Sequence, residues 1–172
     1  MPPTFADRFR RWFDYERDSH AKVLASLETV PADRRAGPEF QKALTLLGHV
    51  TAARRMWLFR LGVLPEAPRE FFPTGLTLPD LAARVADTEA AWVDYFGRLD
   101  DAELARPFEY QSLDGGRFRN TIEEVLTQLF GHSWYHRGQI ATLVRAAGGE
   151  PAITDFIYWA RQPLPPHEPG PR

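Results

Sequence analysis

Cysteine is absent from this 172-residue sequence, which excludes disulfides, thiolate zinc sites and a cysteine nucleophile. Any metal site must therefore use nitrogen and oxygen ligands. The sequence also lacks an apolar run long enough for a signal peptide or a membrane-spanning helix. We therefore expect a cytoplasmic protein with no membrane partner.

Excess positive charge is missing as well. The formal net charge is −2, and lysine and arginine are scattered along the chain, so we do not expect a nucleic-acid partner. The 44% apolar and 26% charged content is ordinary for a soluble globular protein. We expect one domain over residues 1–162, followed by a proline-rich, disordered tail at 163–172.

Apolar residues recur every three or four positions in four long segments, which indicates an all-α four-helix bundle. The expected helices span residues 4–29, 39–61, 78–99 and 120–147. The short link at 31–38 favours packing of the second helix against the first as an antiparallel neighbour. The longer connection at 62–77 is long enough to run back along a helix, so the third helix can lie parallel to the second.

Shorter signals mark the ends of these helices. Residues 100–119 resemble a small β-hairpin, with turn residues at Asp114-Gly115-Gly116. Asn120 and Glu123 are the expected cap of the last helix, and Gly148-Gly149 its stop. The apolar residues 156–159 are expected to close over the bundle.

Two histidines interrupt the apolar stripe of the last helix. His132 follows Val125 by seven residues, and His136 precedes Ile140 by four. Residues four apart share one helix face, so both imidazoles can reach one metal ion. Hydrogen-bonded core histidines are an equal alternative at this point. Because Ser133 stands where the H-E-x-x-H helix of metalloproteases has glutamate, peptidase chemistry is not expected.

Two interpretations are open for each of the other polar residues on the helix stripes. His49 lies on the flank of the second helix's stripe, and by itself favours a surface histidine. Glu16 and His20 share the phase of the first stripe. They either supply a carboxylate partner to a ligand histidine or form a partly solvated pair at the stripe's edge, and the pair is favoured.

The residues around the histidine pair are interpreted mostly as structural. Trp134 and Tyr135 favour core packing or a dimer surface, and Trp57 favours core over a pocket wall. Arg137 can bind a substrate carboxylate, but pairing with an acid on a neighbouring helix is favoured. Gly138 costs about 1 kcal/mol in mid-helix relative to alanine, which predicts a close approach there.

The chain resembles the DinB family, whose four-helix bundle is shared by the related YfiT-type thiol transferases. The resemblance rests on His132-Ser133-Trp134-Tyr135-His136-Arg137-Gly138-Gln139, on His49 in the preceding helix, and on the four-helix pattern over about residues 4–162. It implies an up-down-down-up bundle, a homodimer, and one divalent metal ion bound by His49, His132 and His136.

Such a site leads to two hypotheses. Three neutral imidazoles leave an open position, as in catalytic zinc sites. An ion there can generate hydroxide or hold a low-molecular-weight thiol as thiolate, which suggests a thiol transferase or hydrolase with a small-molecule substrate. Zinc is the first choice, and nickel, iron and manganese stay open. The alternative is a non-catalytic metal-binding or stress-response protein whose ion stabilises the bundle, because no catalytic acid or base is evident.

Overall fold

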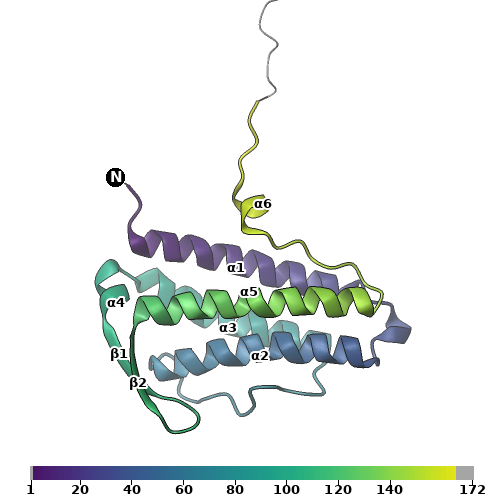
Figure 1. Cartoon of the computed structure of the whole chain (residues 1–172), viewed down its shortest axis with the longest axis horizontal. Helices are drawn as coiled ribbons and strands as arrows, with labels where there is room; N and C mark the ends of the chain where they lie inside the picture. The colour runs from purple at the N-terminus through teal and green to yellow at the C-terminus, as the bar shows by residue number, and fades with distance from the viewer. Residues whose placement is uncertain (1, 166–172) are drawn as a thin grey trace, which may run out of the picture.

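The computed structural model describes residues 2–165, and its frame is four long helices. They are α1 (Phe5–Glu28), α2 (Pro38–Arg60), α3 (Leu78–Arg98) and α5 (Ile122–Ala146). Figure 1 shows α2 and α3 running in one direction and α1 and α5 in the other, with the long connection after α2 returning along the bundle. The predicted all-α, up-down-down-up bundle with a crossover is therefore confirmed.

The order of the helices around the bundle differs from the expectation in one respect. α2 packs against α5 and α3, and α1 packs against α3 and α5. α1 and α2 are antiparallel but occupy diagonal corners, so the expected packing of α2 beside α1 is wrong. The 3₁₀ turn at Ala32–Arg34 lies in the link between these helices, and this link is long enough to reach the diagonal corner.

Threonine-led capping boxes begin three of the long helices. Thr4 pairs with Asp7, Thr77 with Asp80 and Thr121 with Glu124. In each box a side-chain oxygen accepts a hydrogen bond from a backbone N–H that has no partner within the helix. The last cap lies one residue later than Asn120 because Asn120 still belongs to the preceding strand, where it pairs with Phe108.

The remaining elements gather at the ends of the bundle. The predicted hairpin is present, with β1 (Pro107–Gln111) antiparallel to β2 (Arg117–Thr121). The short helix α4 (Asp101–Ala105), which the sequence analysis missed, precedes it. Glycines with positive φ end α2 and α5, at Gly62 and Gly148. None of the helices within residues 2–165 is long and apolar enough to cross a membrane.

The C-terminal helix α6 (Phe156–Ala160) only partly closes the bundle. The rings of Phe156 and Trp159 pack against Tyr15, whereas Ile157 and Tyr158 remain exposed. Figure 1 shows α6 on an extended segment beside α1. The expectation of a segment laid over the bundle is therefore correct for two of its four residues. Residues 166–172 of the predicted disordered tail lie outside the described part of the chain.

The core consists of two apolar clusters separated by a polar layer. One cluster contains the end of α1 and the start of α2, and the other contains the aromatic residues near the opposite end. Buried polar side chains from all four long helices fill the level between them: Glu16, Ser19, His20, Thr51, Arg54, Thr88, Ser133, His136 and Arg137. Buried polar groups are tolerated where they bond to one another, so this layer is a candidate for function.

Candidate metal centre

Three histidines from two adjacent helices meet at the polar layer. The Nε2 atom of His132 on α5 lies 3.1 Å from Nε2 of His49 on α2 and 3.1 Å from Nε2 of His136. One nitrogen from each ring lies within 4.8 Å of the others. His132 and His136 are one turn apart on α5, as their spacing requires. The structure thus brings together all three residues, while ion binding itself stays a prediction.

Hydrogen bonds to the far side of two rings set their tautomers. Nδ1 of His49 lies 2.8 Å from the carbonyl oxygen of Phe71, and Nδ1 of His136 lies 2.8 Å from Oε1 of Gln139. Carbonyl and amide oxygens accept hydrogen bonds and cannot donate them, so each Nδ1 carries the proton. Each neutral ring then directs the lone pair of its Nε2 toward His132.

Convergent lone pairs repel unless a cation lies between them. His132 has one Nε2 proton at most and cannot donate fully to both neighbours. On a tetrahedral ion with bonds of 2.0–2.1 Å, imidazole nitrogens lie about 3.3 Å apart, close to the 3.1 Å separations here. The donor set therefore fits a divalent metal ion, and the group of three histidines can hold one.

The electrostatics favour the neutral form of His132 and His49. Burial lowers the pKa of His132 to about 4, and the neighbouring His136, His49 and Arg54 add to the effect. Burial also lowers the pKa of His49 and outweighs the opposing hydrogen bond to Phe71, and the neighbouring His136 adds a smaller lowering effect. Neutral imidazole is the form that binds metals, so little proton competition is expected at neutral pH.

Behind the triad, Glu16 is the centre of a buried ion-pair cluster. It is fully buried and accepts hydrogen bonds from Arg54 at 2.6 Å, from Trp134 Nε1 at 3.0 Å, and from Arg137. Burial alone would raise the pKa of Glu16, but the charges of Arg54, His20 and Arg137 outweigh it and hold the pKa below its usual range. The partly solvated pair expected for Glu16 and His20 is therefore wrong, because both side chains are buried.

This cluster also decides the role of Arg137. Arg137 is 5% exposed, and its guanidinium bonds to Glu16 and to the hydroxyl of Tyr15, the latter at 2.7 Å. The favoured pairing with an acid on a neighbouring helix is confirmed, and the group is not free to bind a substrate carboxylate. Glu16 makes no hydrogen bond to the three histidines, so the reading of it as their carboxylate partner is also wrong.

Arg54 was missed by the sequence analysis. It follows Leu47 by seven residues and precedes Leu58 by four, and the same phase argument that located His132 would have placed it in the core. Phe71, which orients His49, carried no such signal because it lies in an irregular connection.

Other expectations near the triad changed with the structure. A Cβ at Gly138 would meet nothing within 4 Å, so the predicted close approach is wrong. Trp134 and Tyr135 are 44% and 66% exposed, so the expectation of core packing is wrong for them, and the dimer surface stays a prediction. Trp57 is half-buried and lines a cavity of about 440 Å³ with Tyr110 and other residues of α5 and the hairpin.

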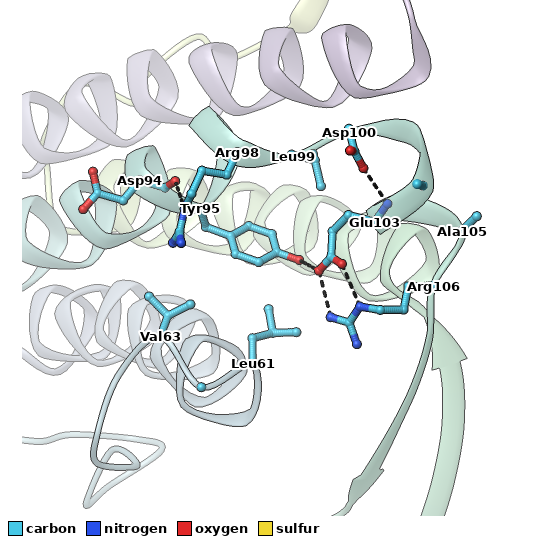
Figure 2. A pocket seen from close by; sticks show the side chains of 12 residues that line it. Leu61, Val63, Asp94, Tyr95, Arg98, Leu99, Asp100, Glu103, Ala105 and Arg106 are labelled. Carbon is cyan, nitrogen blue, oxygen red and sulfur yellow. Dashed lines mark hydrogen bonds and ion pairs between the residues drawn. The ribbon is translucent and has the colours of Figure 1, made fainter.

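A larger cavity lies elsewhere, at the end of the bundle where α3 meets α4. It has a volume of about 990 Å³ and contains none of the histidines. Figure 2 shows Tyr95 directed at Glu103, with the hydroxyl donating at 2.9 Å, while Arg106 donates to both carboxylate oxygens at 2.7 Å. These polar groups satisfy one another, so the cavity's size alone does not indicate chemistry.

The fold and the three-histidine group together define a four-helix-bundle protein with three converging histidines that can hold a metal ion. The family model described as "DinB family" matches residues 1–168. Protein DinB of Bacillus subtilis (strain 168) is 35% identical over 161 residues, an alignment that covers 84% of this chain and 88% of that protein. No solved structure matches this chain. The chain belongs to the DinB family.

Proposed function

We propose that His49, His132 and His136 bind one divalent metal ion, with zinc as the first choice. The observation that carries the proposal is the convergence of three Nε2 atoms, two of them on rings whose proton is held on Nδ1 by an acceptor. Imidazole nitrogens also suit nickel and iron, whereas manganese prefers oxygen ligands. Elemental analysis assigns the metal among these candidates.

We further propose that the site is enzymatic, of the thiol-transferase or hydrolase type. Such an ion supplies Lewis acidity, by which a bound thiol or water loses its proton near neutral pH. The chain contributes the neutral ligands and a place for a small substrate. The 440 Å³ cavity beside Trp57 is lined in part by Gln128, one turn before His132 on α5. That turn is about 6 Å along the helix.

The test begins with metal content. Purified protein should hold one ion per chain, and His49→Ala, His132→Ala and His136→Ala should each bind it far more weakly. His20→Ala is the matched control, because His20 is buried in the same layer outside the triad. Loaded protein is then assayed with low-molecular-weight thiols and electrophiles such as monochlorobimane or epoxides. Activity that survives His136→Ala undiminished rejects an enzymatic role for the ion.

A non-catalytic metal-binding or stress-response role is the second candidate, and a specific observation supports it. Within residues 2–165 the converging group contains no carboxylate, and the buried acid of the polar layer, Glu16, is held by two arginines. This role predicts a large loss of melting temperature on chelation and no turnover of any substrate. A metal-free form as stable as the loaded form argues against it.

We also propose that the protein is a homodimer. Exposed apolar side chains on α5 and α6 support the proposal, among them Tyr135, Ile157 and Tyr158 at 66%, 65% and 54% exposure. Analytical ultracentrifugation should show a dimer that Ile157→Glu dissociates. Leu113→Glu, at an exposed hairpin position, should leave it intact. A monomer at all concentrations refutes the proposal.

A further inference from the structure

The connection between α2 and α3 supplies both contacts that orient His49. The carbonyl oxygen of Phe71 accepts from Nδ1 at 2.8 Å. The ring of Phe72 stacks on the imidazole, with centroids 4.0 Å apart and planes 4° from parallel. Residues 71 and 72 belong to no helix or strand, so the half-buried His49 is held by a loop.

These two contacts fix different degrees of freedom. The carbonyl of Phe71 fixes which nitrogen carries the proton, because a carbonyl only accepts. The stacked ring of Phe72 restricts rotation of the imidazole plane, a torsion that is otherwise broad. Together they direct the lone pair of Nε2 at His132 and His136. Outer partners of this kind usually set both the tautomer and the orientation of a histidine ligand.

Gly48 fixes the position of the loop. A Cβ on Gly48 would lie 2.7 Å from Cγ of Pro73 and 3.0 Å from Cδ1 of Leu76, too close for any other residue without displacing the loop. Gly48, Pro73 and Leu76 are all buried. Gly48 directly precedes His49, so the loop packs against the turn of α2 that carries the histidine it orients.

The exposure of Phe72 also requires an explanation. Its side chain is 57% exposed, so it contributes little to the core. Among the described residues, its one aromatic partner is His49. By contrast Phe118, at 52% exposure, packs on Tyr110 within the hairpin.

We infer that Phe72 is a positioning residue for His49. Its neighbours Phe71 and Pro73 hold the loop in place, and Gly48 is the position on α2 against which the loop packs. The inference rests on the proposed function, because it treats His49 as a metal ligand. It adds that the crossover connection forms part of the metal site.

The first experiment measures metal affinity. Co²⁺ and Zn²⁺ are titrated into wild type, Phe72→Ala, Phe72→Tyr and Gly48→Ala, with the Co²⁺ visible spectrum and chelator competition as readouts. We expect Phe72→Ala and Gly48→Ala to bind about 10- to 100-fold more weakly, the usual effect of losing such a partner. Phe72→Tyr, which keeps the stacking face, should bind within about twofold of wild type. Phe118→Ala is the control and should not change. Wild-type affinity in Phe72→Ala with unchanged melting temperature overturns the inference.

The second experiment needs no metal. Long-range ¹H–¹⁵N spectra of the metal-free protein report the tautomer of each histidine. We expect His49 of the wild type and of Phe72→Ala to carry its proton on Nδ1, because both keep the Phe71 carbonyl. Gly48→Ala displaces the loop and should give a mixture of tautomers while His20 is unchanged. A mixture already in the wild type, or no change in Gly48→Ala, refutes the role of the loop in orienting His49. Failure of the wild type to bind any ion would refute the proposed function instead, and these spectra would still decide the role of the loop.

Discussion

Arg54 on α2 donates two hydrogen bonds to the hydroxyl of Ser133 on α5, from Nε at 3.3 Å and from Nη2 at 3.0 Å. Ser133 is the residue after His132, so this contact ties α2 to α5 at the level of the three histidines. Arg54 also bonds to Glu16 on α1, which connects helices that lie on opposite corners of the bundle. The polar layer thus holds together the two helices that carry the triad.

Removing the charge at the centre of this layer should destabilise the fold. In Glu16→Gln, the guanidinium groups of Arg54 and Arg137 remain buried without a counter-ion, and losing one partner of a buried ion pair costs about 3–5 kcal/mol. Urea denaturation measures the free energy of unfolding. Glu109→Gln, which removes an exposed ion pair with Arg119, should leave it near the wild-type value. A loss below about 1 kcal/mol in Glu16→Gln would show that the layer tolerates an unpaired charge.

The stability of the metal-free protein should depend on pH through His132. Its folded pKa is about 4, whereas an unfolded histidine titrates near 6.5. Between these values the unfolded chain binds a proton that the folded state does not. Stability therefore falls as pH drops from about 6.5 to about 4. Urea denaturation across this range should show a smaller loss in His132→Asn. Parallel profiles for the two proteins would contradict the assignment.

Two glycines should respond to alanine in opposite ways. A Cβ at Gly138 meets nothing within 4 Å, so Gly138→Ala should stabilise the helix by about 0.5–1 kcal/mol. A Cβ at Gly149 would lie 2.7 Å from Val30 and 2.8 Å from Thr29, so Gly149→Ala should cost about 1–3 kcal/mol. Differential scanning calorimetry of both variants measures the two effects. A destabilised Gly138→Ala would restore the close approach expected from the sequence.

Chelation should lower the melting temperature of the loaded protein whichever of the two functions it performs. An ion at 100 times its dissociation constant stabilises the folded state by about 2.7 kcal/mol. For a chain of this size that corresponds to about 5–10 °C. Thermal unfolding with and without EDTA measures the shift, and His132→Ala should show none. An equal shift in that variant would place the ion at another site.

Much of the fold could be predicted because helices are local. The period of 3.6 residues located the four long helices and placed His132 and His136 on one face. The same argument was insufficient for His49, which lies at the edge of its stripe. Only the resemblance to the DinB family joined it to the other two. The cap at Thr121 was missed by one residue because strand pairing of Asn120 with Phe108 determines where the last helix begins.

The sequence by itself determined the four long helical segments, the shared inward face of His132 and His136, and the ligand types that a metal site can use. Only the tertiary structure decided that α2 lies beside α5 and diagonal to α1, that Glu16 is buried between two arginines, and that residues 71 and 72 orient His49. The physical reason is the separation along the sequence of the residues that interact. Helix periodicity depends on neighbours three and four residues away, whereas these relationships join residues from 22 to 121 positions apart and depend on the packing of the whole bundle.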